Sequence, residues 1–239
     1  MFDFSGKKII VTGASSGVGR ETAILLSKMN AQVVLIARRE NELEKTMSML
    51  NKGAHYYKVA DLSDFNGTIR TFKDIVTLDG KKIDGVAHCA GAARITSIRA
   101  VTEAILDNMF RLNLYSLAAI LKCAASKRYF NPRASIIAIS SNAALDGQKG
   151  NVAYSAAKAA MIGLVKAADF ELRERDIRTN LILPVGIDTE MLRNLPNQGS
   201  MLKIDSTKLM SPRQIADIIS FYLSPCSEPI SSTYLLFGE

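Results

Sequence analysis

Short apolar runs alternate with longer stretches of helical periodicity along most of this chain. The runs have the length and the branched residues of buried strands, and the stretches between them carry apolar residues at helical spacing. Strands are predicted at Lys8–Val11, Gln32–Ala37, His55–Val59, Ile83–His88, Ser135–Ile139, Arg178–Leu183 and Tyr234–Phe237. Strands that alternate with helices are typical of βαβ units. The pattern therefore predicts an α/β fold with a doubly wound parallel sheet of about seven strands and helices on both faces.

The helical stretches are long enough to cover both faces of such a sheet. They are predicted at Val18–Met29, Glu40–Leu50, Val101–Lys127 and Val152–Glu174. The last two are apolar on so many faces that we expect them to cover the core or a subunit contact. No repeat or Pro/Gly-rich linker divides the chain, so residues 1–239 are expected to form one domain. The least regular stretch, Gly186–Met210, is either a mobile lid or an ordinary surface connection.

Three glycines stand where the first strand turns into the first helix. Their spacing is G-x-x-x-G-x-G, and they lie between a buried strand and a helix. Glycine lets the backbone turn tightly and approach a pyrophosphate, whose charge lies at the positive end of the helix. The turn predicts a dinucleotide-binding Rossmann fold, with a purely structural turn as the alternative. The expected cofactor contacts here are Gly13, Ser15, Ser16, Gly17, Val18 and Gly19.

The end of the second strand indicates which dinucleotide binds. An acidic residue there typically holds the ribose hydroxyls of NAD, whereas an arginine accommodates the 2′-phosphate of NADP. Ala37 offers no carboxylate, and Arg38 and Arg39 follow it. Two guanidinium groups can make charge-assisted hydrogen bonds to a phosphate. NADP is therefore expected rather than NAD, although a solvated helix start would also explain the two arginines.

The next two strand ends add cofactor contacts. Asp61 follows the third strand, where its carboxylate can accept a hydrogen bond from an adenine amino group. Ala90 and Gly91 follow the fourth strand. Small residues there let the chain pass close to the cofactor.

Tyr154 and Lys158 stand four residues apart in a predicted helix, so their polar ends meet on one face. An unperturbed phenol titrates at about pH 10 and is a poor base at neutral pH. A neighbouring ammonium favours the phenolate and is expected to lower the pKa of Tyr154. The pair is a candidate for proton transfer, although chance also produces this spacing.

Composition narrows the class of protein. Hydrophobic residues make up 48% and charged residues 22%, and the formal net charge is +7. The basic residues are dispersed, so we expect a phosphate-bearing small molecule as a partner rather than nucleic acid. Three separated cysteines and two histidines favour reduced thiols and no metal site. No signal peptide or apolar run of about 18 residues occurs, so a cytoplasmic protein without membrane contact is expected.

Taken together, these motifs resemble the short-chain dehydrogenase/reductase family, from about residue 5 to about residue 225. The glycine turn is similar to the family's cofactor turn, Asp61-Leu62 to its adenine contact, and Tyr154 with Lys158 to its Y-x-x-x-K motif. Asn113 matches the family's helix asparagine. Ser141, thirteen residues before Tyr154, matches its substrate-orienting serine. Leu62 is an expected cofactor contact as part of that adenine contact, and the family's nicotinamide-facing loop adds Pro184, Ile187 and Thr189.

The resemblance implies a mechanism. Ser141 would bind the substrate oxygen, with Ser140 as a substitute, and Tyr154 would exchange a proton with that oxygen while a hydride moves between nicotinamide and substrate. Lys158 would lower the pKa of Tyr154 and hold the nicotinamide ribose, and Asn113 would position a water that links the lysine to solvent. It further implies a carbonyl or alcohol substrate, with 3-oxoacyl-carrier-protein reductases as a well-populated group, and a homotetramer or homodimer.

The chain departs from the family's pattern at several positions. His88-Cys89 stands where the family usually has two asparagines, and His88 is interpreted as a structural hydrogen-bonding residue. Ser16 stands where many NADP-preferring relatives have a basic residue, and Val185 replaces a glycine. The chain has little sequence after the strand-like Tyr234–Phe237, where relatives form a tetramer interface. Two alternatives stay open: a cofactor-sensing or scaffold protein without turnover, and a reductase of a sugar derivative.

Overall fold

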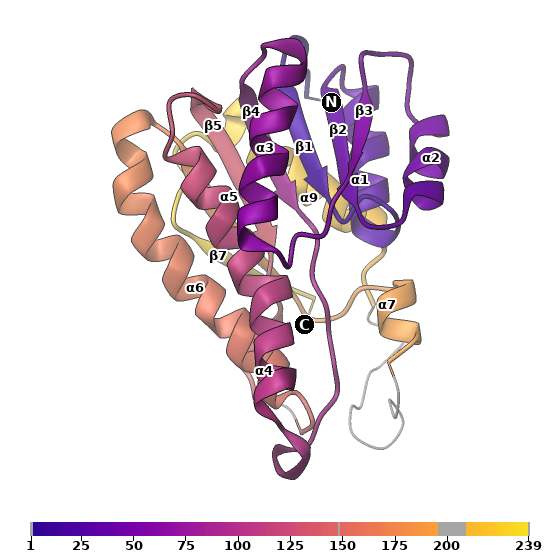
Figure 1. Ribbon diagram of the computed structural model, residues 1–239, viewed down its shortest axis with the longest axis vertical. Helices are drawn as coiled ribbons and strands as arrows, with labels where there is room; N and C mark the ends of the chain where they lie inside the picture. Colours follow the sequence, from indigo (N-terminus) through magenta and orange to yellow (C-terminus); the bar gives the residue numbers. More distant parts are fainter. Residues whose placement is uncertain (1, 148, 196–208, 239) are drawn as a thin grey trace.

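Seven parallel strands form one sheet in the computed structural model, which describes residues 2–147, 149–195 and 209–238. The strand order is β3-β2-β1-β4-β5-β6-β7 (Figure 1). The strands are β1 (Lys8–Thr12), β2 (Gln32–Ala37), β3 (Tyr56–Val59), β4 (Ile83–His88), β5 (Phe130–Ile139), β6 (Arg178–Pro184) and β7 (Tyr234–Phe237). The predicted α/β fold with a doubly wound parallel sheet is confirmed.

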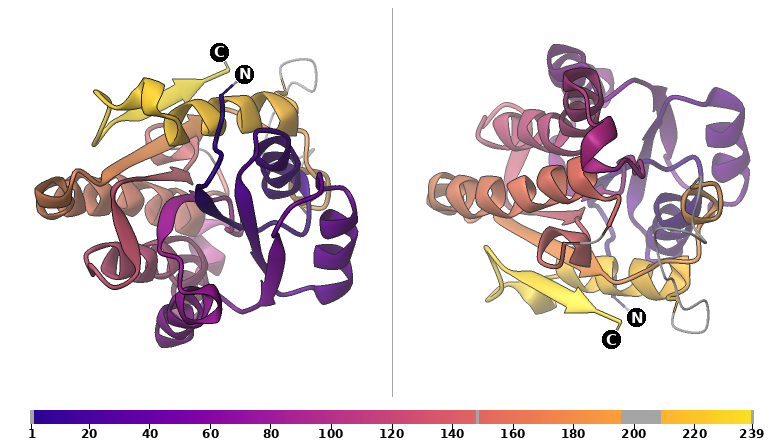
Figure 2. Two further views of the ribbon diagram at one scale, coloured as in Figure 1. Left: turned by 90° about the horizontal axis from the view of Figure 1, so that it is seen from above. Right: turned by 90° about the horizontal axis from the view of Figure 1, so that it is seen from below.

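Helices cover both faces of this sheet. They are α1 (Gly17–Lys28), α2 (Glu40–Ser48), α3 (Phe65–Asp79), α4 (Glu103–Phe110), α5 (Ser116–Ala124), α6 (Val152–Leu172), α7 (Glu190–Arg193) and α9 (Pro212–Leu223). Figure 2 shows α9 and α1 together on one side of the sheet, with α3, α5 and α6 on the other. No helix in the described part of the chain is both long enough and apolar enough to cross a membrane.

The alternation of side chains along β1 explains the two layers of core. Ile9 and Val11 point to the face that α1 and α9 cover, where they join a buried cluster. Ile10 points to the opposite face and packs in the cluster formed with α3, α5 and α6. All three side chains are at most 2% exposed. Burial of each contributes roughly 1.5–3 kcal/mol, so both faces of the central strand hold helices to the sheet.

The predicted helix Val101–Lys127 is confirmed over residues 103–124, but a π-helical turn lies inside it. Thr102 caps the start of α4, since its hydroxyl accepts a hydrogen bond from the Ile105 N–H at 3.3 Å. A π-helical turn at Arg111–Tyr115 then separates α4 from α5. Such a turn inserts one residue into a helix and is often found at functional sites. Apolar periodicity does not report it, because the residues on either side remain helical.

The strand order reverses between β1 and β4, which pair directly. In open α/β sheets, ligands bind outside the carboxyl ends of the strands at such a point. The glycine turn follows β1 and the Cys89–Ala93 segment follows β4. The fold therefore places both segments beside the same crevice.

Candidate active site

A cavity of about 750 Å³ lies at the carboxyl ends of the strands. Among the described residues that line it are all the predicted site residues except Asn113. These are Gly13, Ser15, Ser16, Gly17, Val18, Gly19, Arg38, Arg39, Asp61, Leu62, Ala90, Gly91, Ser141, Tyr154, Lys158, Pro184, Ile187 and Thr189. The fold thus brings together segments that lie far apart in the sequence.

The glycine turn packs so closely that side chains are excluded. Gly13 has φ +66°, and a Cβ there would lie 2.8 Å from the Ala90 nitrogen. A Cβ on Gly19 would overlap the Gly13 carbonyl. Among the described residues, no side chain caps the N-terminus of α1 at Ser16. The first residues of α1 therefore line the cavity without a side-chain cap, an arrangement that suits an anion.

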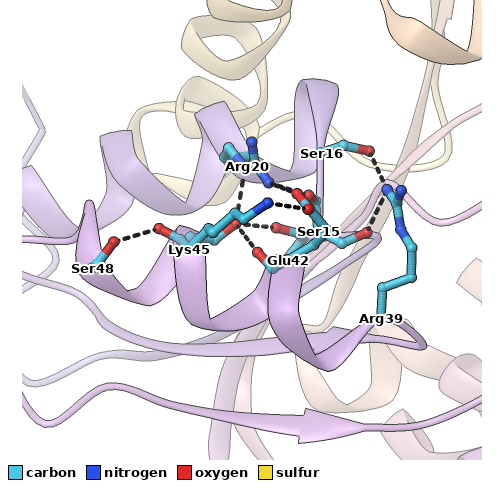
Figure 3. Close-up of polar contacts among 9 residues, drawn as sticks. Ser15, Ser16, Arg20, Arg39, Glu42, Lys45 and Ser48 are labelled. Atoms are coloured by element: carbon cyan, nitrogen blue, oxygen red, sulfur yellow. Dashed lines mark hydrogen bonds and ion pairs between the residues drawn. The ribbon is translucent and has the colours of Figure 1, made fainter.

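Arg39 lies across this turn. Its Nη2 donates to the Ser16 hydroxyl at 3.3 Å and lies 3.5 Å from the Ser15 hydroxyl (Figure 3). Ser16 occupies the N-cap position of α1, yet its hydroxyl is turned toward the guanidinium. Arg38 also lines the cavity. The end of β2 thus adds positive charge to the N-terminus of α1.

A second arginine joins the glycine turn to α2. Arg20 donates through Nη2 to the Ser15 carbonyl and, at 2.7 Å, to the Glu42 carboxylate, and through Nε to the Thr46 hydroxyl at 3.0 Å. The Thr46 hydroxyl donates to the Ala14 carbonyl at 2.9 Å. Lys45 and Arg20 hydrogen-bond Glu42 and lower the pKa of its carboxyl to about 2. We call Arg20, Glu42 and Thr46 the turn clamp; no sequence motif indicated it.

Tyr154 and Ser141 meet at the wall of the cavity formed by α6 and the end of β5. Ser141 ends the extended segment after β5, and its hydroxyl accepts from the Ala143 N–H at 3.2 Å. A hydrogen bond with Ser141 lowers the pKa of Tyr154, but burial raises it more. Ser140 does not substitute for Ser141, since its hydroxyl donates to the Lys158 carbonyl at 3.0 Å.

Lys158 lies one helical turn beyond Tyr154 and is only 4% exposed. Its Nζ lies 5.7 Å from the centre of the Tyr154 ring and donates to the Ile139 carbonyl at 2.8 Å. Burial lowers the pKa of Lys158 to about 7. The spacing predicted that the ammonium would lower the pKa of Tyr154, and in the structure the net direction is upward. Desolvation penalises the phenolate of Tyr154 and outweighs its hydrogen bond with Ser141.

Asn113 lies behind the cavity wall, fully buried in the π-helical turn. Its Nδ2 donates to the carbonyls of Met109 and Ala92 at 2.9 and 3.1 Å, and its Oδ1 accepts from the Ala92 N–H at 3.3 Å. A Cβ added to Gly91 would lie 2.8 Å from Asn113 Oδ1 and 3.4 Å from Lys158 Nζ. Asn113 and Lys158 therefore approach the same point, and Gly91 leaves that point open.

The remaining predicted contacts occupy the rim. One Asp61 oxygen accepts from the Ser63 N–H at 3.0 Å, which fixes the carboxylate at the end of β3. Thr189 caps α7, because its hydroxyl accepts from the Leu192 N–H at 3.3 Å. A Cβ on Gly17 would lie 3.3 Å from the Thr189 methyl group. The loop after β6 thus closes over the start of α1.

Several lining residues were not predicted. Leu236 and Gly238 come from β7 and the residue after it, and Asn142, Asp146 and Asn151 come from the segment between β5 and α6. Their positions depend on tertiary folding, and no motif marks them. Of the predicted Gly186–Met210 segment, residues 196–208 lie outside the described residues. The described parts of this segment include α7 and an isolated parallel bridge between Ile187 and Met210.

Comparison with known proteins gives one consistent result. The sequence model of the family described as "short chain dehydrogenase" matches residues 7–199. The short-chain dehydrogenase/reductase aba4 of Botryotinia fuckeliana is 30% identical over 95% of this chain and 93% of its own length. The 3-oxoacyl-(acyl-carrier-protein) reductase FabG of Rickettsia conorii is 26% identical over 94% of this chain and 92% of its own. A Serratia marcescens short-chain dehydrogenase/reductase structure superimposes with TM-score 0.88 at 24% identity, over 98% and 97% of the two chains.

Proposed function

The chain belongs to the short-chain dehydrogenase/reductase family, whose members are oxidoreductases, and we propose that it moves a hydride between NADP(H) and a carbonyl or secondary alcohol with Tyr154 as the acid and base. One observation carries the proposal: the glycine turn, Ser141, Tyr154 and Lys158 line one cavity. Members of this family act on CH–OH or carbonyl groups with NAD(P).

The geometry of the cavity fits a dinucleotide. Because Gly13 and Gly19 lack side chains, the turn packs against Ala90 and against itself, and its backbone can stay close to a bound pyrophosphate. The N-terminus of α1 supplies backbone donors for the phosphates. Asp61 and Lys158 also line the cavity; Asp61 is proposed to accept from the adenine amino group, and Lys158 to donate to a ribose hydroxyl. When bound, the cofactor supplies or accepts the hydride.

Arg38 and Arg39 are proposed to select NADP over NAD. Arg39 already orients toward the hydroxyls of Ser15 and Ser16, so a phosphate there would meet a guanidinium and two hydroxyls together. Ala37 ends β2 without a carboxylate, so nothing at that position repels the phosphate. Arg20 and Lys45 form ion pairs with Glu42, which offsets the negative charge of this α2 carboxylate.

Tyr154 is proposed to donate a proton to the substrate oxygen during reduction and to accept it during oxidation. Ser141 lies beside the phenol and holds the same oxygen in place by hydrogen bonding. A pKa raised by burial keeps the phenol protonated at neutral pH, which suits an acid in the reductive direction. Lys158, with a pKa near neutrality (about 7), then returns a proton to Tyr154. Asn113 approaches the same point as the Lys158 ammonium and is proposed to position a water that links Lys158 to solvent.

One wall of the cavity supports an apolar substrate. The segment after β6, together with β7, contributes mostly apolar side chains to it: Val185, Met191, Leu192, Leu195, Leu209 and Leu236. A 3-oxoacyl thioester is the first substrate to test, because its acyl chain suits this lining and the Rickettsia relative is named for that activity. The net charge of +7 would also favour an acidic carrier protein.

We further propose that the whole chain is one domain that assembles as a homotetramer or homodimer. Tyr234, Leu235 and Leu236 of the edge strand β7 are exposed, as is Phe170 on α6. Exposed edge strands with apolar side chains are uncommon on monomers.

Titration of the purified protein with NADPH and NADH, followed by turnover of a carbonyl panel, tests the proposal. We expect NADPH to bind more tightly than NADH and a 3-oxoacyl thioester to be reduced. Tyr154→Phe should retain NADPH binding while kcat falls by roughly 10²–10⁴-fold. Unchanged turnover in Tyr154→Phe would remove its role, and binding without turnover of any carbonyl would favour a cofactor sensor.

A further inference from the structure

The π-helical turn that holds Asn113 needs help from side chains. In an α-helix, the N–H of Ser116 would donate to the carbonyl of Leu112. Here that N–H donates to the carbonyl of Arg111, five residues back. The Ser116 hydroxyl donates to the Leu112 carbonyl at 3.0 Å instead. Ser116 thereby satisfies a carbonyl that the wide turn leaves without its helical partner.

The Ser116 hydroxyl also meets a buried histidine. His88 ends β4 and is 1% exposed. Its Nε2 lies 3.1 Å from the Ser116 hydroxyl, and its Nδ1 lies 2.9 Å from the Thr12 hydroxyl at the end of β1. The Thr12 hydroxyl in turn accepts from the Ala90 N–H at 3.1 Å. One imidazole thus spans from the strand before the glycine turn to the π-helical turn.

We assign one tautomer to this network. The Ser116 hydroxyl has one hydrogen, and we assign it to the Leu112 carbonyl at 3.0 Å, so the hydroxyl accepts from His88 and the proton lies on Nε2. Nδ1 is then an acceptor, and the Thr12 hydroxyl donates to it. In this tautomer, each polar hydrogen along the series of hydrogen bonds from Ala90 through Thr12, His88 and Ser116 to Leu112 has an acceptor. Burial, with a smaller effect of Lys158, lowers the pKa of His88 to about 3, so the ring stays neutral.

We propose that His88 is a positioning residue that joins the glycine turn to the π-helical turn. Through these hydrogen bonds it fixes the position of Asn113 relative to the glycine turn. This inference rests on the proposed function, since it assigns His88 to the placement of Asn113 opposite Lys158. The Thr12 end of the ring supports Ala90, which packs against Gly13. The Ser116 end supports the turn that carries Asn113. Neither end touches substrate, so His88 acts through its neighbours.

Two substitutions separate the ends of the ring. An Asn amide lies the same number of bonds from Cβ as Nδ1, and a Gln amide the same number as Nε2. His88→Asn therefore keeps a partner for Thr12 and loses Ser116, whereas His88→Gln keeps Ser116 and loses Thr12. We expect His88→Asn to lower kcat by roughly 10-fold or more and to shift the pH profile of kcat, because small displacements of a catalytic group are costly.

We expect His88→Gln to act on the cofactor instead. Loss of the Thr12 hydrogen bond should raise the Kd of NADPH by about 3- to 10-fold, with kcat at saturation close to that of the unchanged protein. Ser116→Ala should reproduce His88→Asn, and the double variant should add little, because both remove the same link. His55→Asn is the matched control, since His55 lies before β3 and bonds Val33 and Asn51 there.

A nitrogen-15 spectrum of the histidine rings provides a readout that does not depend on activity. The chain has two histidines, so His55→Asn assigns both signals. We expect His88 to show the Nε2–H tautomer and no titration down to about pH 4. A proton on Nδ1 would overturn the proposal. So would equal kinetic losses in His88→Asn and His88→Gln that simply follow the loss of Tm in each variant. If no carbonyl is turned over, the proposed function fails, while the tautomer and the NADPH Kd still decide whether His88 links the two turns.

Discussion

Lys158 carries a largely buried amino group at the wall of the cavity, where the residue is 4% exposed. Burial lowers its pKa from 10.5 to about 7, and its Nζ donates a hydrogen bond to the Ile139 carbonyl at the end of β5. A lysine with a lowered pKa binds its proton more weakly in the folded chain than in the unfolded chain. The folded state therefore loses stability as the pH falls from about 10.5 to about 7, and the loss stays constant below that range.

Replacing this lysine is expected to stabilise the protein and to remove its activity. Lys158→Met keeps most of the side-chain volume without the buried charge, so Tm should rise. The rise should be larger at about pH 7 than at about pH 10. Differential scanning calorimetry at both pH values measures the effect. Lys73→Met, an exposed lysine on α3, should change Tm by far less. A Tm of Lys158→Met at or below that of the unchanged protein at neutral pH would contradict the argument.

His88 is expected to give the fold an acid-sensitive component. Burial and the charge of Lys158 lower its pKa from 6.5 to about 3, so the unfolded chain takes up a proton that the folded chain excludes. Stability then falls as the pH drops from about 6.5 toward about 3, by on the order of 1 kcal/mol per pH unit. His88→Asn removes this pH dependence. The variant should therefore be less stable than the unchanged protein at about pH 7, and the difference in the free energy of unfolding, measured with urea, should be smaller at about pH 4.5.

His55 requires a control in the same experiment, because burial lowers its pKa as well. His55→Asn should therefore lose part of the acid dependence, but less than His88→Asn, since His55 is far less buried. An equal change in both variants would mean that the network around His88 contributes nothing specific.

At the scale of elements, the structure joins α2 to the glycine turn in two different ways. Arg39, just before α2, reaches the hydroxyls of Ser15 and Ser16. The turn clamp instead holds the carbonyls of Ala14 and Ser15 through Thr46 and Arg20. The first contact faces the proposed 2′-phosphate, and the second supports the turn that any dinucleotide would use.

These two links predict different cofactor effects. Arg39→Gln should raise the Kd of NADPH by roughly 10- to 100-fold and barely change that of NADH, because a charge-assisted contact is worth about 1.5–3 kcal/mol. Thr46→Val should weaken both cofactors alike, by about 3- to 10-fold. Fluorescence titration with each cofactor distinguishes the cases, with Arg128→Gln as a control for net charge. Equal weakening of NADH and NADPH by Arg39→Gln would contradict its role in selection.

The elements that sequence predicted best are those with strong apolar patterns. β2 and β4 occur at their predicted bounds, because their buried side chains leave little choice of register. The π-helical turn escaped prediction, since Asn113 and Ser116 read as ordinary polar interruptions of a helix. Ser141, Tyr154 and Lys158 were placed together by motif spacing. The turn clamp and the bridge at His88 join residues 26 and 28 positions apart, and only the packed fold brings such pairs into contact.

At the scale of the molecule, one side of the sheet ends in an apolar surface. β7 is an edge strand, and Tyr234 and Leu235 are 41% and 43% exposed there. Lys166 of α6 lies over the Tyr234 ring at 5.3 Å, so α6 and β7 share this surface. Phe170, 74% exposed, extends it along α6. A symmetric partner would bury a row of unpaired edge groups together with these side chains.

A charge on this surface should therefore reduce the size of the assembly. Leu235→Lys is expected to shift the protein from a tetramer or dimer to a smaller species in light scattering coupled to gel filtration. Leu78→Lys is the matched control, because Leu78 is an exposed leucine on α3, away from β7. Leu236, the neighbour of Leu235, lines the cavity, so loss of the partner should also raise KM for an apolar substrate more than it lowers kcat. An unchanged mass for Leu235→Lys would exclude β7 from the interface, and an unchanged KM in a dissociated variant would show that the cavity is complete within one chain.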